Sequence, residues 1–489
     1  MNRNEEKHLC SSENQVPSPP LTAAPSKEAS EEQISSNVPP PYSAFPRSRR
    51  LFILIIVTIA GFFSPLCGAV YLPSLVLYTK IFRTTTSVIN ATVSVYMVVF
   101  AIAPLFGAAS ADYGGRKTVY LVTLAIFILS NILLATIPPN IGALFTLRVF
   151  QALGSSMVTS VGAGTVADIT EPARRASALA IFLLGPQLGP ILGPFIGGQF
   201  AMFSRWRWAF GFLAITCTPV YILILFYLPE TLRCLVGNGE VLASRGWFVQ
   251  PQLRQVALVD DSQFPNPPRP TLKTYFKHLS YLPQLIVAFN GALQFAGLYC
   301  MYITFPRVWE LEYGFSTAEV GYAYLSPGIA LFIASLVIGR VSDVLYRRSI
   351  RHHDGRKPAP ERRLMMQYFG FAVGAAGKLM YGWFSKYHIH PAGGLVGSAL
   401  AAVGTGIIMI TSTSFQTEYF PGQAASLVAV AGMMRNVGAA ISAAIIDPLL
   451  DGMGLGWCFT GLAILDMVSI IGIFWIMKDV IKREAASSD

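Results

Sequence analysis

The chain has 489 residues, of which 53% are hydrophobic and only 13% are charged. Soluble domains carry about twice that charged fraction, so the composition excludes an ordinary soluble protein. The net charge is +10, but the basic residues are scattered among the ends of apolar segments, and this distribution argues against nucleic-acid binding. The composition therefore predicts a protein that is embedded in a lipid bilayer.

Residues 1–48 differ in kind from the rest of the chain. They are rich in serine, proline, glutamate and glutamine and contain no apolar run, so they cannot bury enough apolar surface to fold alone. They also lack the charged start, apolar core and cleavage site of a secretory signal. We expect a disordered cytosolic tail here.

Twelve apolar segments follow, each long enough for a transmembrane helix, which needs about 20 residues. They predict an all-α membrane protein with twelve transmembrane helices in two pseudo-symmetric six-helix bundles, over 49–230 and 282–480. We expect a cytosolic central linker at 231–281 and a short cytosolic tail at 481–489. The segments lie near 51–73, 89–110, 117–137, 141–167, 175–201 and 208–229, and then near 283–306, 318–342, 363–384, 392–414, 424–446 and 457–477.

Basic residues mark one side of this predicted array. Most of them fall in loops on the side of the N-terminus, although the opposite loops also contain some. Because basic loops stay in the cytosol, we expect both termini to be cytosolic, in a multi-pass protein of the plasma membrane. The loops on the N-terminal side hold Arg116, Lys117, Arg174, Arg175 and a cluster at 347–363, whereas the opposite loops hold Lys80, Arg83, Arg205 and Arg207.

Two short loops repeat one pattern of charges about half the chain apart. Asp112 is followed four and five residues later by Arg116 and Lys117, and Asp343 is followed in the same way by Arg347 and a second arginine. A charged loop repeated at half the length of a membrane protein is typical of a duplicated transporter. These residues are candidates for conformational gating, in which they latch the bundles in one state, or they only cap and orient helices.

The fifth predicted span carries glycine at every fourth position from Gly185 to Gly197. This spacing places a bare stripe on one helix face, which another helix can approach closely. A proline follows three of the glycines, and each proline removes a backbone donor and favours bending. Gly189, Pro190, Gly193 and Pro194 are therefore further gating candidates, and close helix contact without a role in transport is the alternative.

Several of these segments carry a resemblance to a known family. The loop at Asp112 resembles the signature loop of the major facilitator superfamily, although Ala108 stands where that loop usually has glycine. The glycine stripe resembles the motif that distinguishes exporters in this superfamily. Three segments resemble the fungal twelve-span drug:proton antiporter family: Arg148–Gly154, Gly164–Thr170 and Trp206–Phe210. Leu228–Gly239, together with the variant Gly114–Lys117 of the signature loop, resembles the branch that contains the spore-wall dityrosine transporter and the fungal citrate exporters.

The resemblance implies a transporter, expected to be a monomer, that works by alternating access. In this mechanism the two bundles rock about a cavity near the middle of the membrane. The resemblance places the cavity between spans 1, 2, 4 and 5 and spans 7, 8, 10 and 11.

Ionisable residues deep in a bilayer cost several kcal/mol, so each one that lies deep in a predicted span needs a function or a partner. The basic ones are Arg148, Lys378 and Arg435, and the acidic ones are Asp466 and, nearer a helix end, Asp447. The excess of basic groups favours an anionic substrate.

Each basic residue keeps more than one interpretation. Arg148, with Gln151 one turn away, could bind a carboxylate, or helix carbonyls could satisfy it. Lys378 could bind an anion, carry a coupling proton or extend to an interface. Arg435 could line the cavity or brace the two halves. Further candidates for substrate binding or coupling are Gln187, Asn290, Gln294 and Tyr299.

No motif in the sequence points to a metal, a cofactor or an enzyme active site. The six cysteines form no CxxC pair and no Cys/His pair with metal-ligand spacing, and neither GxSxG nor HExxH is present. No GxxxxGK[ST] phosphate loop is present, which argues against an ATP-driven pump. We expect a transporter without cofactors, driven by protons or by the gradient and charge of its substrate.

The main hypothesis is a secondary active transporter that exports a small organic anion, a di- or tricarboxylate such as citrate or itaconate. The closest alternative is a multidrug:proton antiporter of broad specificity. A membrane-bound enzyme and a non-transporting sensor are the other classes. The expected partners are the small-molecule substrate, protons and the lipid bilayer, with no nucleic acid.

Overall fold

The computed structural model describes residues 43–171, 174–202, 205–239, 280–352, 359–419 and 424–486, together with two short strands. Within these parts, the side chains of the strands and of residues 108, 175–177, 202, 343, 346–347, 349–352, 417–419, 424–428 and 483–486 are outside the description. The expected tail, apart from 43–48, and most of the expected central linker lie outside the described residues.

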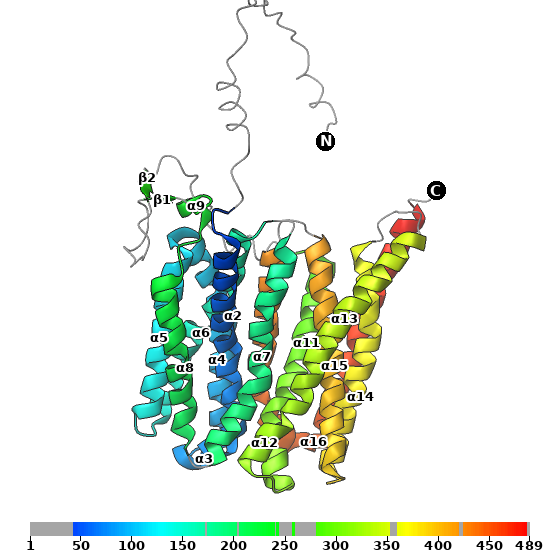
Figure 1. Ribbon diagram of the computed structural model, residues 1–489. Helices are drawn as coiled ribbons and strands as arrows, with labels where there is room; N and C mark the ends of the chain where they lie inside the picture. Colours follow the sequence, from blue (N-terminus) through cyan, green and yellow to red (C-terminus); the bar gives the residue numbers. More distant parts are fainter. Residues whose placement is uncertain are drawn as a thin grey trace, which may run out of the picture. The chain divides into compact units, whose positions relative to one another are not determined.

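Helices make up almost all of the described chain (Figure 1). We call the helices from α2 to α8 the N-half and those from α11 to α16 the C-half. The N-half comprises α2 (Arg47–Val70), η1 (Leu72–Ser74), α3 (Leu75–Phe82), α4 (Thr86–Gly114), α5 (Arg116–Thr136), α6 (Ile141–Ile169), α7 (Arg175–Met202) and α8 (Trp206–Tyr227).

A short helix, α9 (Arg233–Val236), and a pair of parallel strands, β1 (Val241–Ala243) and β2 (Ala257–Val259), follow the N-half. The C-half comprises α11 (Leu282–Pro306), π-helical η4 (Arg307–Glu312), α12 (Thr317–Ala323), α13 (Leu325–His352), η5 (Pro360–Met365), α14 (Met366–Lys386), α15 (Pro391–Tyr419) and α16 (Ala424–Ala486).

These helices supply the predicted membrane crossings. Ten helices in the described part of the chain are long and apolar enough to cross a bilayer. That count takes α16 as one helix. Its backbone leaves helical geometry at Gly454, where φ is +73°, so α16 provides two crossings. The remaining crossing is α14, whose glycines, Gln367 and Lys378 lower its hydropathy, but which packs against α15 and α16. The predicted all-α fold of two six-helix bundles is confirmed.

Local sequence signals set several helix ends. The Asn140 side chain accepts the backbone N–H of Ala143 at 3.1 Å and caps α6. Ser316 and Glu319 form a capping box at the start of α12, in which each side chain accepts the backbone N–H of the other residue.

The glycine stripe of α7 faces α2. A Cβ atom at Gly189 would lie 2.7 Å from the backbone nitrogen of Leu66, and one at Gly193 would lie 2.5 Å from Cβ of Ala69. The helix continues through its prolines, which include Pro190 and Pro194. The stripe is therefore a close seam within the N-half, because only a residue without a side chain leaves room for the backbone of α2.

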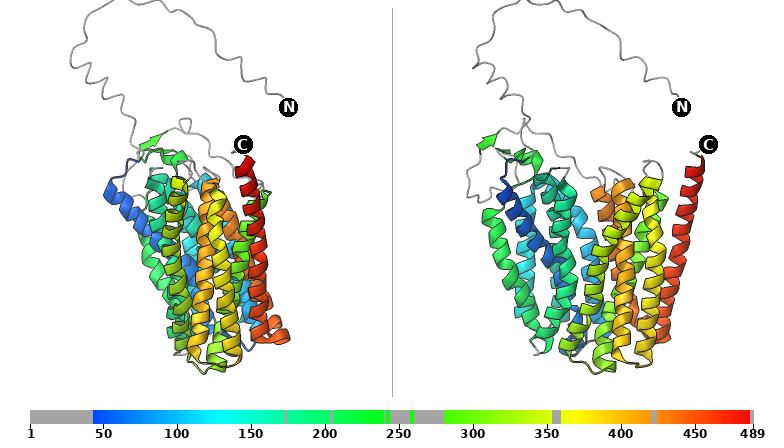
Figure 2. Two further views of the ribbon diagram at one scale, coloured as in Figure 1. Left: turned by 90° about the vertical axis from the view of Figure 1, so that its right-hand side faces the viewer. Right: turned by 45° about the vertical axis from the view of Figure 1, so that its right-hand side comes forward.

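The start of α2 and the end of α16 lie at one end of the helix array (Figure 2). The opposite end, where α3 and α12 lie, is called the distal end here (Figure 1). The two halves meet there: a Cβ atom at Gly198 of α7 would lie 3.0 Å from Cα of Gly321 in α12. Asn90 of α4 also donates a hydrogen bond to Asp447 of α16 at 2.9 Å.

Gly189→Ala is expected to destabilise the protein, because the added methyl group would meet the backbone of α2. Over-packing of this kind costs about 1–3 kcal/mol. Thermal unfolding of the detergent-purified protein would measure the effect. Gly461→Ala in α16 is the matched control, since a Cβ atom there meets nothing within 4 Å. Equal unfolding temperatures for the two variants would contradict a close α2–α7 seam.

Candidate functional site

Arg148 lies in α6 with a fully buried side chain, clamped between two tyrosine rings. Its guanidinium carbon lies 4.1 Å from the ring centroid of Tyr71 and 4.4 Å from that of Tyr96. Tyr71 follows the last turn of α2 and shares a hydrogen bond of 2.8 Å with Thr92, whereas Tyr96 belongs to α4 and shares one of 3.1 Å with Ser155. Three elements of the N-half thus hold the cation in an aromatic clamp.

The hydrogen bonds of Arg148 leave part of its guanidinium unused. Nη1 donates to Oε1 of Gln151 at 2.8 Å, and Nε2 of Gln151 donates to Oδ1 of Asn131 at 2.8 Å. Nε and Nη2 of Arg148 are buried and have no hydrogen-bond partner. None of the ion pairs between described residues includes Arg148. Two N–H donors of a buried cation are therefore left without an acceptor among the described residues.

Lys378 has the opposite environment. Its Nζ lies 2.7 and 2.8 Å from the two carboxylate oxygens of Asp466 and 3.3 Å from Oε1 of Gln294. Nε2 of Gln294 also donates to Asp466 at 2.6 Å, and all three side chains are buried. These residues come from α14, α16 and α11, so they join three helices of the C-half. The carboxylate neutralises the ammonium group, and Lys378 offers no free charge to a substrate in this conformation.

Arg435 lies in the part of α16 that precedes Gly454, and its side chain is partly exposed. It is flanked by positions that carry no side chain: a Cβ atom at Gly432 would lie 3.4 Å from its Nη2, and one at Gly291 would lie 4.0 Å from its Cγ. No hydrogen bond or ion pair joins Arg435 to another described residue. It is therefore a second cation without a carboxylate partner, contributed by the C-half.

Tyr299 of α11 lies on the side of the C-half that faces this clamp. Its hydroxyl is within electrostatic range of Arg148, and its side chain is partly exposed. Its ring centroid lies 5.0 Å from that of Phe295 and 6.0 Å from that of Tyr302. The structure thus brings an aromatic group of the C-half toward the cation of the N-half.

Two other predicted residues have no described hydrogen bond with Arg148. Asn290 of α11 is buried, and its Nδ2 lies 3.5 Å from the backbone oxygen of Ser469, so it faces the part of α16 that follows Gly454. Gln187 of α7 is partly exposed. The structure therefore joins Arg148 to Gln151, with Tyr299 within electrostatic range, and turns Asn290 toward α16.

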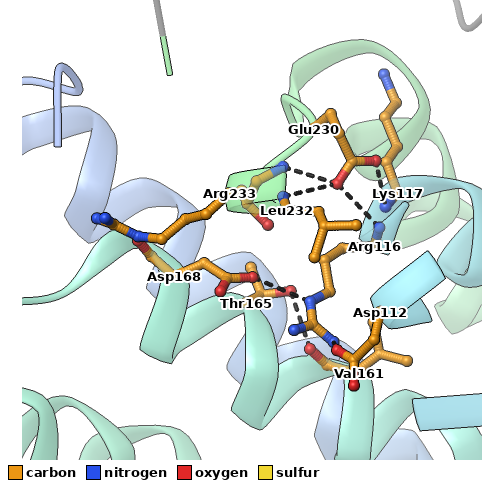
Figure 3. Close-up of polar contacts among 10 residues, drawn as sticks. Asp112, Arg116, Lys117, Val161, Thr165, Asp168, Glu230, Leu232 and Arg233 are labelled. Atoms are coloured by element: carbon orange, nitrogen blue, oxygen red, sulfur yellow. Dashed lines mark hydrogen bonds and ion pairs between the residues drawn. The ribbon is translucent and has the colours of Figure 1, made fainter. Parts of the chain in front are cut away.

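Arg116, the first residue of α5, joins three helices at the end opposite the distal end (Figure 3). Its Nη1 lies 2.7 Å from Oδ1 of Asp112 in α4, and its Nε lies 3.0 Å from Oδ2 of Asp168 in α6. Gly164 makes room for this contact, since a Cβ atom there would lie 2.6 Å from the guanidinium carbon. The predicted gating residues Asp112 and Arg116 are thus paired with each other within the N-half.

Glu230, which follows α8, binds the start of α5 (Figure 3). Its carboxylate accepts four backbone N–H groups at 2.9 to 3.1 Å, those of Arg116, Lys117, Thr231 and Leu232. A carboxylate at a helix N-terminus satisfies donors that have no partner within the helix. Sequence reasoning placed Asp168 and Glu230 in family-like segments but gave them no role. The sequence shows an acidic residue in each of these segments, but only the fold brings the two acidic residues close to Arg116.

Asp343 and Arg347 lie in α13, but their side chains are outside the described part of the chain. The second charged pair therefore stays a prediction. Among the described residues, no group of three or more His, Cys, Asp and Glu side chains could hold a metal ion.

Two bundles of membrane-crossing helices are typical of a membrane transporter. The chain belongs to the major facilitator superfamily, because the model of that family, described as Major Facilitator Superfamily, matches residues 57–443. The family and the fold define a transporter rather than an enzyme.

The chain is similar to transporters of yeasts over most of its length. It is 41% identical to "Dityrosine transporter 1" of Saccharomyces cerevisiae, over 89% of this chain and 81% of that protein. It is 37% identical to "Multidrug transporter DTR1" of Candida glabrata, over 90% of this chain and 86% of that protein. Among solved structures, a POT family transporter in complex with a thioalcohol-conjugated peptide has a TM-score of 0.62, at 15% identity, over 87% of this chain and 96% of that one.

Asp466→Asn is expected to destabilise the C-half strongly, because it leaves the buried ammonium of Lys378 without a counter-charge. Breaking one side of a buried ion pair costs about 3–5 kcal/mol, whereas replacing both sides by apolar groups is often neutral. The double variant Lys378→Met/Asp466→Leu should therefore unfold at a higher temperature than Asp466→Asn in detergent. The opposite order would show that the pair is not closed in the folded protein.

Proposed function

We propose that this transporter exports organic carboxylates from the cytosol across the plasma membrane by alternating access, with both termini in the cytosol. The observation that carries the proposal is Arg148, a buried guanidinium with two unused N–H groups and no carboxylate partner among the described residues. A carboxylate has two oxygens that can accept both donors. The Tyr71 and Tyr96 rings keep the guanidinium plane fixed for such a ligand.

A second cation supports the same substrate class. Of the three basic residues that the sequence places deep in the spans, Lys378 is neutralised by Asp466, which leaves Arg148 in the N-half and Arg435 in the C-half. A substrate with more than one acceptor group could contact both halves as they rock. Cationic substrates would be repelled by both arginines.

Two kinds of carboxylate fit these cations. One is a compact di- or tricarboxylate, such as citrate or itaconate. The other carries an aromatic ring as well. The partly exposed ring of Tyr299, which is within electrostatic range of Arg148 and packs against Phe295, supports it. The relative at 41% identity is named for dityrosine, which has both carboxylates and phenol rings. We therefore favour an aromatic carboxylate.

The rival function is a multidrug:proton antiporter. The name of the relative at 37% identity supports it, and so do the same aromatic rings, which would contact a hydrophobic drug. The two functions differ in their need for a cation: export of a hydrophobic drug gains nothing from Arg148, whereas export of a carboxylate depends on it.

We assign a gating role to the residues that the sequence analysis predicted for it. Asp112, Arg116 and Lys117 would hold the cytosolic ends of α4, α5 and α6 together, and Asp343 and Arg347 would act in the equivalent loop of the C-half. The α7 seam at Gly189, Pro190, Gly193 and Pro194 would let α2 and α7 move as one unit. The protein would act as a monomer, with proton exchange as a further driving force.

Arg148→Ala is expected to abolish export of the carboxylate while the protein still reaches the membrane. Arg148→Lys keeps the charge but loses the planar pair of donors, so export should fall about tenfold or more. Expression in a transporter-depleted fungal host, followed by mass spectrometry of the medium against an empty vector, would identify the exported acid. Uptake into inverted vesicles of citrate, of an aromatic carboxylate and of a hydrophobic drug would then separate the candidate substrates.

The matched control is Lys378→Met/Asp466→Leu, which removes a buried basic residue that is already neutralised, and it should retain export. Normal export by Arg148→Ala would remove this arginine from the mechanism. An unchanged acid profile together with raised resistance to unrelated drugs would replace the carboxylate function with the multidrug one.

A further inference from the structure

Two buried polar side chains from different halves meet at the distal end. Nδ2 of Asn90, in α4, donates to Oδ2 of Asp447, in α16, at 2.9 Å. The two residues are only 1% and 7% exposed. Oδ1 of Asn90 is also buried and has no partner. This hydrogen bond exists only while the halves touch here, because each half supplies one side of it.

The Asp447 carboxylate has no cation as a direct partner among the described residues. The charged groups within electrostatic range are Arg307 of η4 and Asp451 of α16, which pair with each other at 3.7 Å. From α4, the groups that face it are the neutral side chains of Asn90 and Ser87. An ionised carboxylate in this position is nearly removed from water and lacks the counter-charge that would stabilise it.

A second contact between the halves at the distal end is weaker. Nζ of Lys80 in α3 lies 4.0 Å from Oε1 of Glu310 in η4, and the lysine side chain is 68% exposed. An ion pair of this length at an exposed lysine contributes little and is screened by salt. The contact of Asn90 with Asp447 is therefore the polar contact on which closure of this end depends most.

We propose that Asn90 and Asp447 form a proton-operated latch that holds the two halves closed at the distal end. When the halves separate there, Asp447 becomes hydrated and ionises readily, whereas in the closed state its ionised form is poorly solvated. A proton on Asp447 therefore favours the closed state, and loss of that proton favours the open state. The Asn90 amide can donate its hydrogen bond to the protonated and to the ionised carboxyl group of Asp447.

In the transport cycle, this latch would act after substrate release. The proposed orientation places the distal end outside the cell, and on that orientation an acidic exterior returns the empty transporter to its cytosol-facing state. The latch itself does not depend on the identity of the substrate, because neither residue contacts the Arg148 clamp through a described hydrogen bond.

A reporter cysteine can test the latch without a substrate. Ser94 lies one turn further along α4 on the same face as Asn90, and its hydroxyl donates to the backbone oxygen of Asn90 at 3.3 Å. In a chain whose native cysteines are replaced by alanine, Ser94→Cys would be shielded from the distal side when the latch is closed. Thr86→Cys, exposed at the start of α4, is the matched reporter that stays accessible in both states.

Whole cells would be treated with a membrane-impermeant maleimide at each pH. The labelling at position 94 would then be divided by the labelling at position 86. This ratio removes the pH dependence of the thiol reaction itself. We expect this ratio to rise about tenfold as the medium is changed from acidic to mildly alkaline, because the carboxyl group then loses its proton. Asp447→Asn should hold the ratio low at every pH. Asn90→Asp/Asp447→Asn, which exchanges the two groups, should restore the pH dependence.

A ratio that does not change with pH, or that changes equally in Asp447→Asn, would overturn the proposal. Failure of the exchanged pair to restore the pH dependence would overturn the pairing of the two residues. In right-side-out vesicles the distal end faces the medium and the maleimide can reach it, so a ratio that followed the pH of the lumen, which is then the cytosolic side, would contradict an external proton. Because no substrate is used, these outcomes are independent of the carboxylate test on Arg148.

Discussion

A charge within a bilayer-spanning bundle must have a partner, a route to water or a ligand, and this constraint organises the interior of the protein. Lys378 meets it with a partner, since Asp466 and Gln294 enclose its ammonium group. Arg435 has no described partner, and its side chain is partly exposed. Arg148 is fully buried and has no carboxylate partner, and two of its N–H groups have no acceptor among the described residues.

The close seam between α2 and α7 serves this site. Tyr71, one wall of the Arg148 clamp, directly follows the last turn of α2, and the glycines of α7 hold that helix at backbone contact. A bulkier residue in the stripe would displace α2 and move the tyrosine ring away from the guanidinium. The same glycines therefore contribute both to the close packing of the N-half and to the position of the Tyr71 ring beside the Arg148 guanidinium.

The two ends of the N-half use polar groups in different ways. At the end near the start of α2, Arg116, Asp112, Asp168 and Glu230 bind one another within the N-half, so they stiffen it and can travel with it as a unit. At the distal end, Asn90 reaches across to Asp447, so that contact must break when the halves separate. Rigid halves with breakable contacts between them are what a rocking transporter needs.

Part of the site could be read from the sequence because it depends on local order. The twelve apolar segments, the repeated charged loops and the glycine period follow from composition and spacing, and they gave the fold and the α7 stripe. Arg148 with Gln151 was readable as well, because residues three apart share a helix face, and the structure joins them at 2.8 Å.

The partners of the charges were decided only by the tertiary structure. Lys378 and Asp466 look alike in the sequence as lone charges in apolar helices, and only the approach of α14 to α16 shows that they neutralise each other while Arg148 stays unpaired. Asp168, Glu230 and the contact of Asn90 with Asp447 were not readable for the same reason. Spacing along one helix fixes which face a residue occupies, but which charge lies opposite depends on how helices distant in sequence come together.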